Sequence, residues 1–147
     1  MRYTINRITD GEDELILNYQ ELNAEVEEAL FFMEKRIKKL MGKKNGETVI
    51  FSPQDILYVE KVDNRTFAYT VDNEIQLDMS LYSVERMLGD SNYFRCSKSM
   101  ILNVNKVERL KSMSSNRIDA TLTNGEHIII SRTYASDFRK LLKGEKS

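Results

Sequence analysis

The stretch Tyr93–Asn103 reads YFRCSKSMILN and carries a short polar, basic insert inside an otherwise hydrophobic run. It contains neither glycine nor proline, the residues that most often mark a loop. An aromatic and basic entry precedes the Ser-Lys-Ser insert, and three apolar residues, Met100-Ile101-Leu102, follow it. A polar, cationic insert between such apolar flanks is a candidate point of contact with a partner.

The sequence around this stretch is patterned for β-strands. From Glu47 onward apolar residues recur with a period of two, which is typical of strands with one buried face. Asp72-Asn73 predicts a two-residue turn, and Asn124-Gly125 is the strongest hairpin signal in the chain. The strand candidates, rich in β-branched and aromatic residues, are ETVIF, DILYVEKV, TFAYTV, EIQLDM, NRIDATLT and EHIIIS. Most of this half is therefore predicted to be antiparallel sheet.

Two amphipathic helices interrupt the strands. SLYSVERMLG has Ser80 as N-cap and Gly89 as stop, and SRTYASDFRKLLKG ends before Gly144. Their apolar faces are formed by Leu81, Val84, Met87 and Leu88 in the first and by Tyr134, Phe138, Leu141 and Leu142 in the second. Both faces are expected to cover the sheet, so the predicted fold class is mainly β with flanking helices (α+β).

The N-terminal part has a different pattern. Two strand-like segments flank the turn-prone DGEDE and predict a small hairpin in which Arg2–Ile8 pairs with Glu14–Tyr19. A helix is expected over Asn23–Met41, closed by Gly42, and its apolar stripe consists of Val26, Leu30, Met33, Ile37 and Leu40. The stripe either packs within the chain or forms a self-association helix. GKKNGE is interpreted as a linker, which divides the chain into a strand and helix extension, 1–42, and a main domain, 43–147.

Composition is that of a folded protein with one main core. The 147 residues are 41% hydrophobic and 31% charged, and the net charge is −1. Residues 1–42 hold six basic and nine acidic side chains, whereas residues 43–147 hold 16 basic and 14 acidic ones. A polyanion is therefore expected to prefer the second segment. No apolar window is long enough for a signal peptide or a membrane span, so the expected location is the cytoplasm.

No constellation for catalysis stands out. His127, the sole histidine, lies inside a strand candidate, and a single cysteine, Cys96, permits neither an intrachain disulfide nor a cysteine-based zinc site. Cys96 is either an idle buried thiol or a redox sensor beside the Ser-Lys-Ser insert. No glycine-rich phosphate loop occurs. We therefore expect no enzyme, no catalytic residue, no metal and no cofactor.

Four separate blocks resemble the LytTR family of bacterial DNA-binding domains: DILYVE, SLYSVERML, FRCSKSMILNVNKVERL and NGEHIIISRTY. Their order matches the family pattern over about residues 43–143. The resemblance implies an antiparallel β-fold that binds double-stranded DNA through loops in successive major grooves. Side chains that read base edges must protrude, so a loop between buried strands needs polar tips and apolar anchors.

The resemblance also implies which residues contact DNA. Base-reading positions fall on Arg132, Lys98 and Arg65, and the DNA backbone is expected to be contacted by Ser99, Ser97 and Lys61. Many relatives carry His followed by Arg or Asn where this chain has Ser97-Lys98. Since lysine is a flexible point charge, Lys98 contacts either a base or a phosphate.

The whole chain looks like the compact LytTR regulators that carry a short strand and helix extension instead of a receiver domain. This implies a transcription regulator that acts as a homodimer, at least on DNA, and that is restrained by a small integral membrane partner. The alternative is a protein-interaction module that sequesters a regulator or is held by a membrane partner. RNA binding is a poorer third interpretation, because stacking aromatics cannot be told from core residues here.

Overall fold

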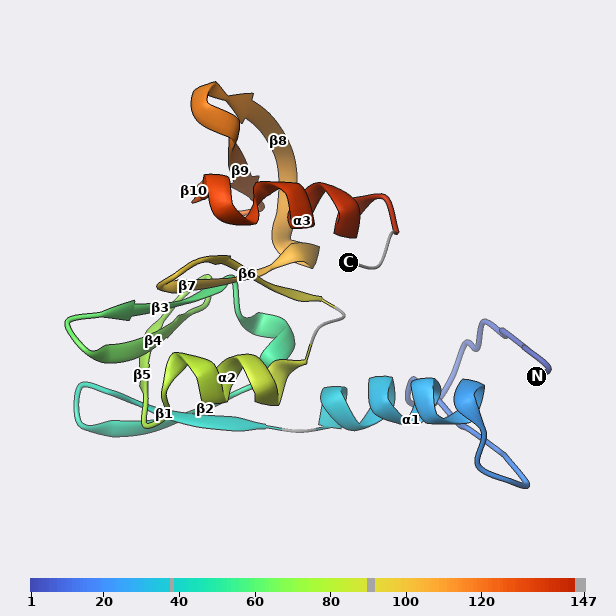
Figure 1. The fold of residues 1–147 in the computed structure, drawn as a ribbon. Helices are drawn as coiled ribbons and strands as arrows, with labels where there is room; N and C mark the ends of the chain where they lie inside the picture. Colours follow the sequence, from blue (N-terminus) through green and yellow to red (C-terminus); the bar gives the residue numbers. More distant parts are fainter. Residues whose placement is uncertain (38, 90–91, 145–147) are drawn as a thin grey trace. The chain divides into compact units, whose positions relative to one another are not determined.

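The structure is a computed structural model that describes residues 1–37, 39–89 and 92–144 (Figure 1). The chain divides into two compact units, residues 1–38 and residues 39–147. The division falls somewhat before the expected boundary between residues 42 and 43.

The first unit contains a single helix, α1 (Ala24–Ile37). Its N-cap is Asn23, because the Asn23 side chain accepts a hydrogen bond of 3.0 Å from the amide of Val26. The predicted hairpin is wrong for this chain, because residues 1–22 contain no strand. Two strands without a third strand or a covering layer are only marginally stable, so the β-type pattern alone does not produce a ladder.

In its described residues, 39–89 and 92–144, the second unit contains ten strands in two sheets. The strands are β1 (Leu40–Lys44), β2 (Glu47–Phe51), β3 (Tyr58–Val62), β4 (Arg65–Tyr69), β5 (Glu74–Leu77), β6 (Tyr93–Ser97), β7 (Met100–Asn103), β8 (Val107–Met113), β9 (Arg117–Leu122) and β10 (His127–Ile130). A seven-stranded sheet has the order β2-β1-β5-β4-β3-β7-β6, and a three-stranded sheet has the order β10-β9-β8. Every pairing is antiparallel, which confirms the predicted β-fold.

Two helices cover the sheets, as predicted. They are α2 (Leu81–Leu88) and α3 (Arg132–Leu142), and three short 3-10 turns lie at Pro53–Asp55, Val104–Lys106 and Ser114–Asn116. The side chain of Ser80 accepts a 3.1 Å hydrogen bond from the amide of Ser83 and so caps α2. In Figure 1, α2 lies against the seven-stranded sheet, and α3 lies beside β6 and the three-stranded sheet.

The predicted end of the N-terminal helix and the predicted linker are both wrong, because β1 occupies this part of the chain. The helix stops at Ile37 and does not reach Met41, and GKKNGE forms the end of β1, a turn and the start of β2. The turn residues Asn45 and Gly46 have φ values of 51° and 81°, which suit a tight hairpin. Gly42 lies within β1. This position requires glycine, because a side chain there would collide with Ile75 and the Gln76 carbonyl of β5.

The hairpin predictions further along the chain have mixed outcomes. The β9–β10 hairpin at Asn124-Gly125 is confirmed, and Gly125 has a φ of 89°. Asp72-Asn73 is not a two-residue turn, because β4 and β5 are joined through the longer segment 70–73. The Thr70 hydroxyl closes this loop by accepting a 3.0 Å hydrogen bond from the Asn73 amide.

The second unit has two hydrophobic cores that share the strands β3 and β7. The first core packs the buried face of α2 on one side of the seven-stranded sheet and includes Val59 and Ile101. The second core lies between α3, the three-stranded sheet and the other side of β3 and β7, and it includes Tyr58 and Leu102. Both faces of this strand pair are therefore buried, which explains the continuous apolar runs around the Ser-Lys-Ser insert.

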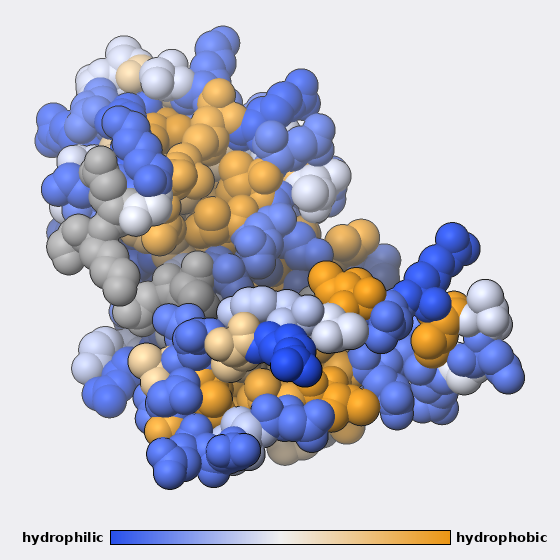
Figure 2. All heavy atoms as spheres, turned by 90° about the vertical axis from the view of Figure 1, so that its right-hand side faces the viewer, coloured by the Kyte–Doolittle hydropathy of each residue, from blue (hydrophilic) through white to orange (hydrophobic). Residues whose placement is uncertain are grey.

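The surface over β8–β10 and α3 is not entirely polar. Figure 2 shows hydrophobic side chains gathered there between hydrophilic ones. Leu110 of β8 is 42% exposed and Leu142 of α3 is 47% exposed, although Leu142 was expected on the buried face of its helix. Phe138, by contrast, is fully buried and anchors α3 on the sheet.

Asn103, at the end of β7, is a buried polar residue whose side chain joins two segments. Its Nδ2 donates a 2.8 Å hydrogen bond to the carbonyl of Ile56, and its Oδ1 accepts one of 3.1 Å from the amide of Asn105. We expect Asn103→Ala to lower the free energy of unfolding by about 2 kcal/mol, because a buried carbonyl loses its donor. Urea denaturation measures this change through the transition midpoint.

Asn105→Ala is the matched control for this substitution. Its side chain is exposed and only its backbone amide takes part in the hydrogen bond, so a change of less than about 0.5 kcal/mol is expected. Equal effects of the two substitutions would contradict the role assigned to Asn103.

Candidate nucleic-acid interface

The Ser-Lys-Ser insert forms the turn between β6 and β7. Ser97 pairs with Met100, so Lys98 and Ser99 are the two connecting residues, and both are exposed. The register shifts between Arg95 and Ser97, which is a β-bulge. Bulges of this kind change the direction of a strand and of the side chains that follow it. The Ser97 hydroxyl accepts a 3.2 Å hydrogen bond from the Ser99 amide and so tightens the turn.

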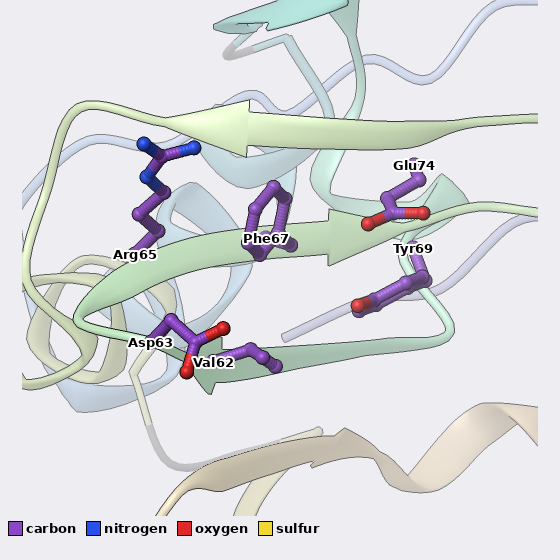
Figure 3. Close-up of a pocket in the computed structure, with 6 residues that line it drawn as sticks. All are labelled: Val62, Asp63, Arg65, Phe67, Tyr69 and Glu74. Carbon is purple, nitrogen blue, oxygen red and sulfur yellow. The ribbon is translucent and has the colours of Figure 1, made fainter.

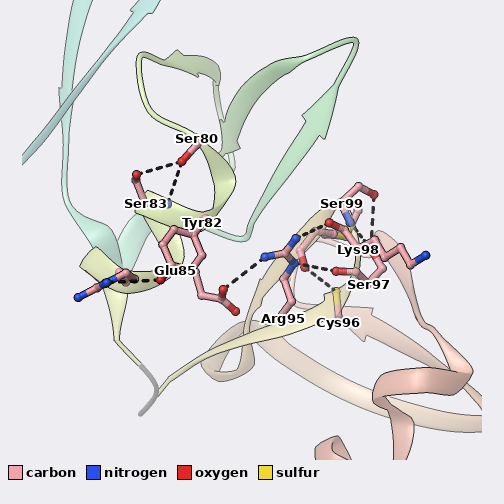
Figure 4. A network of polar contacts seen from close by, with 11 residues as sticks. Ser80, Tyr82, Ser83, Glu85, Arg95, Cys96, Ser97, Lys98 and Ser99 are labelled. Atoms are coloured by element: carbon pink, nitrogen blue, oxygen red, sulfur yellow. Dashed lines mark hydrogen bonds and ion pairs between the residues drawn. The ribbon is translucent and has the colours of Figure 1, made fainter.

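The side chain of Arg95 is hydrogen-bonded to the backbone of this turn. Its Nε donates a 2.9 Å hydrogen bond to the carbonyl of Ser97, and a second guanidinium nitrogen donates to the carbonyl of Lys98 (Figure 4). The third nitrogen lies 3.3 Å from a carboxylate oxygen of Glu85 on α2. A planar guanidinium can serve three acceptors in fixed directions, so Arg95 ties the turn to the helix beneath it.

A second turn lies beside the first. β3 and β4 are joined by Asp63 and Asn64, whose φ values of 50° and 64° match a type I′ hairpin turn. Arg65 is the first residue of β4 and is exposed. The amide of Lys61 on β3 donates a 2.8 Å hydrogen bond to the carbonyl of Ser99, so the two turns project from the same end of neighbouring strands.

The start of α3 is joined to the same region. The amide of Ser131 donates a 3.0 Å hydrogen bond to the carbonyl of Cys96, which directly precedes the Ser-Lys-Ser turn. Arg132 follows as the first residue of α3 and is exposed. A cation at a helix N-terminus is opposed by the helix dipole, so its position does not improve the stability of the helix.

Four cations are therefore presented by three neighbouring segments: Lys61, Arg65, Lys98 and Arg132. Within the described residues none of the four forms an ion pair, whereas Arg95 is paired with Glu85. Exposed and unpaired cations near one another raise the local positive potential even in a chain with a net charge of −1. Such a surface is suited to a polyanion.

A shallow hollow of about 410 Å³ lies next to the β3–β4 turn (Figure 3). Arg65, Phe67 and Tyr69 follow one another on the same face of β4 and form its floor. Asp63 and Glu74 also line it, so Arg65 shares its surroundings with two carboxylates. The Ser-Lys-Ser turn that carries Lys98, by contrast, contains no carboxylate.

The six residues proposed from sequence all lie on these segments. Ser97, Lys98 and Ser99 form the β6–β7 turn, while the remaining three are Lys61, Arg65 and Arg132. Sequence reasoning allowed Arg95 a structural role but named no partner for it, and the pairing with Glu85 joins residues ten positions apart through tertiary contact. No local signal identifies such a pair.

Cys96 is fully buried at the bulge, and its thiol lies 3.7 Å from the carbonyl of Met100. Burial raises the pKa of the Cys96 thiol to about 12, so very little thiolate is present near neutral pH. The structure therefore favours the idle thiol over the redox sensor.

The described residues contain no group of histidine, cysteine, aspartate and glutamate side chains arranged to hold a metal ion. Among the same residues, no helix is both long and apolar enough to cross a membrane. His127 contacts Asp119 at 2.9 Å on the surface of the three-stranded sheet, away from the three segments above.

Comparison with known proteins agrees with a surface that binds a polyanion. A family profile described as "LytTr DNA-binding domain" matches residues 46–143. A solved structure, the LytTr DNA-binding domain of a putative methyl-accepting/DNA response regulator from Bacillus cereus, superposes with a TM-score of 0.68. It is 27% identical, and the match covers 71% of this chain and 95% of that one.

Curated relatives are regulators of greater length. The sensory transduction protein LytT of Enterococcus faecalis is 30% identical over 100 residues, covering 66% of this chain and 41% of the relative. LytT of Bacillus subtilis is 29% identical over 98 residues, with the same coverage. The transcriptional regulatory protein YpdB of Escherichia coli K12 is 29% identical over 98 residues, covering 65% and 40%. The match thus spans about two fifths of these relatives.

We expect Arg95→Lys to loosen the β6–β7 turn, because an ammonium group cannot donate to two carbonyls and Glu85 in the same directions. Amide exchange measured by NMR should become faster at Ser99 and Lys61 by on the order of tenfold. Arg86→Lys, on the exposed side of α2, is the control and should leave both amides unchanged. Unaltered protection in the Arg95 variant would show that the turn holds itself.

We expect the Cys96 thiol to react with dithionitrobenzoate at pH 8 on the order of 100-fold more slowly in the folded chain than in urea. Because its folded pKa is about 12 and its ordinary value 9.0, the stabilising effect of the bound proton is complete below pH 9 and is lost as pH rises towards 12. Fast stoichiometric reaction of the folded chain would revive the sensor interpretation.

Proposed function

Because the chain belongs to the LytTr DNA-binding domain family, we propose that it is a transcription regulator that reads specific, repeated DNA sites through loops in the major groove. One observation carries this proposal: three segments with unpaired cations project from one end of the second unit. Backbone hydrogen bonds from the amides of Lys61 and Ser131 hold these segments together. Loops on a rigid sheet are suited to reading base edges, because their side chains reach into the groove without rearrangement.

Arg132 is the first candidate for a base contact. A guanidinium can donate two parallel hydrogen bonds to O6 and N7 of guanine, which is the commonest specific contact in the major groove. Lys98 stands at the tip of its turn and can bind either a base edge or a phosphate. Arg65 is the third proposed base contact, and its contribution is expected to be smaller because Asp63 and Glu74 lie nearby.

The remaining residues of the interface are proposed to contact the DNA backbone. Ser97 and Ser99 carry hydroxyl groups at the turn, and Lys61 supplies a positive charge beside it. Phosphate contacts position the protein on the duplex and carry no sequence information directly. Since the chain as a whole is close to neutral, affinity rests on this local patch and should fall with salt.

Two protomers are proposed to bind two repeats spaced by about one helical turn, about 10 base pairs. Doubling the contacts in this way compensates for the small number of base-reading residues in one copy. The proposed setting is the cytoplasm, with a small integral membrane protein as a restraining partner. No enzymatic activity is proposed.

The second candidate function is that of a protein-interaction module, and the first unit favours it. Large apolar side chains such as Ile5 and Ile16 are 97% and 69% exposed. Apolar surface of this kind is typical of a protein contact. A purified chain that binds no DNA but captures a membrane protein would support this candidate over the first.

The decisive experiment selects bound duplexes from a random DNA pool with the purified chain at near-physiological salt. Enrichment of two repeated elements about one turn apart is expected. Arg132→Ala should then weaken binding to the enriched site by about 1–3 kcal/mol and relax the preference at one base pair. Lys98→Ala should weaken binding to all sequences and reduce the salt slope by about 1 if Lys98 contacts a phosphate.

Arg109→Ala is the matched control, because Arg109 is an exposed arginine on β8 outside the three segments. It should leave the selected sequence and the affinity unchanged. An Arg132→Ala variant with the same affinity and base preference as the Arg109→Ala variant would remove Arg132 from the interface. Absence of any enriched sequence would contradict the proposed DNA-binding function and favour the protein-interaction module.

A further inference from the structure

The first unit exposes an unusual amount of apolar surface. Half of the exposed large hydrophobic side chains in the described part of the chain belong to residues 1–38, about a quarter of the sequence. They are Met1, Tyr3, Ile5, Ile8, Leu15, Ile16, Tyr19, Leu22 and Phe32. Isolated exposed apolar residues are ordinary, but a group of this density within one short segment indicates a surface that is normally covered.

The same segment has strand-type sequence without strand pairing. Residues 2–8 and 14–19 are rich in β-branched, aromatic and leucine side chains, and DGEDE separates them. No backbone hydrogen bond joins one residue of the described segment 1–22 to another. The peptide groups of this segment are therefore available to pair with another strand.

The first unit also lacks a core of its own. Val26 is its sole buried hydrophobic residue among the described side chains. The Tyr3 hydroxyl donates a 3.2 Å hydrogen bond to Glu25, which holds the start of the chain next to α1. Chains below roughly 40 residues rarely fold alone without disulfides, metals or a partner subunit, so this unit needs a partner to become stable.

We infer that two copies of the chain dimerise through residues 1–22 and α1. In this dimer the segments 2–8 and 14–19 pair as strands of a sheet shared between the copies, and the exposed apolar side chains form the core between them. The inference deepens the proposed function by naming the dimer surface, and it predicts a dimer that exists without DNA.

The charges of the first unit are unevenly distributed along the chain, so a second copy can bring opposite charges together although the segment is acidic as a whole. The first turn of α1 carries Glu25 and Glu27. Residues 2–8 carry two arginines and no acidic side chain, whereas DGEDE carries four acidic side chains. A two-fold axis can therefore bring the basic part of one copy next to the acidic part of the other.

The test is sedimentation equilibrium of the full chain without DNA, at concentrations around and above micromolar. The wild-type chain is expected to sediment at twice the monomer mass of 17.2 kDa. Ile5→Asp and Ile16→Asp should each raise the dimer dissociation constant at least tenfold, since each places a charge in the proposed core. Both side chains are largely exposed in the single chain, so the second unit should stay folded, as circular dichroism can verify.

Ile50→Asp is the matched control, because Ile50 is 64% exposed but belongs to β2 of the second unit. It should leave the dimer intact. Amide exchange gives an independent readout. The amides of residues 2–8 and 14–19 should exchange slowly in the wild-type dimer, and their exchange rates should rise at least tenfold in the Ile5→Asp variant. Either a monomeric wild-type chain or a dimer broken by Ile50→Asp and not by Ile5→Asp would overturn the inference.

Affinity for a single DNA element, measured on the same preparations, separates this inference from the proposed function. The monomeric Ile5→Asp variant should bind DNA with one element as tightly as the wild-type chain does. Unlike the wild-type chain, it should not bind DNA with two elements more tightly than DNA with one. A stable dimer that binds no DNA would overturn the proposed function and leave the dimer surface supported. Unchanged cooperativity in Ile5→Asp would overturn the dimer surface alone.

Discussion

The pairing of β3 with β7 is the constraint on which the rest of the second unit depends, because both faces of this strand pair are buried. Val59 pairs with Ile101 towards the core under α2, and Tyr58 pairs with Leu102 towards the core under α3. A shift of one residue in this register would exchange the two sets of side chains between the cores. The positions of both helices, and of the turns at the ends of these strands, follow from this single register.

Rigid support changes what the exposed cations can do. Arg95 directs its guanidinium at turn carbonyls and Glu85, so its charge serves the structure, while Lys98 at the tip of the same turn remains exposed. Positioning the tip before a partner arrives reduces the entropy lost on binding. Arg95 before the bulge supports the turn, and Lys98 after the bulge is exposed to a partner. These separate roles explain why the apolar strands carry a basic residue on each side of the bulge.

Local signals in the sequence were enough for the parts of the fold that depend on local chemistry. Ser80 capped its helix and Asn124-Gly125 made its hairpin as predicted, since each acts on its immediate neighbours. Leu40 continues the apolar spacing of α1, so local pattern predicts helix there, but Leu40 begins β1. β1 packs through Gly42 against β5, which follows about thirty residues later and gives no local signal. The Ser-Lys-Ser loop of the site was predicted, whereas the contact between Arg95 and Glu85 required the tertiary structure.

The register of β3 against β7 also bears on how the chain reaches its native state. Tyr58 and Leu102 lie far apart in the sequence, and α2 and β6 lie between them, so a long loop must close before either core can form. Folds dominated by such distant contacts cross their folding barrier slowly. During synthesis the strands β1 to β5 emerge first, and the free edge of β3 stays unpaired until β7 follows. The step that completes the two cores is thus also the step that assembles the surface proposed to meet DNA.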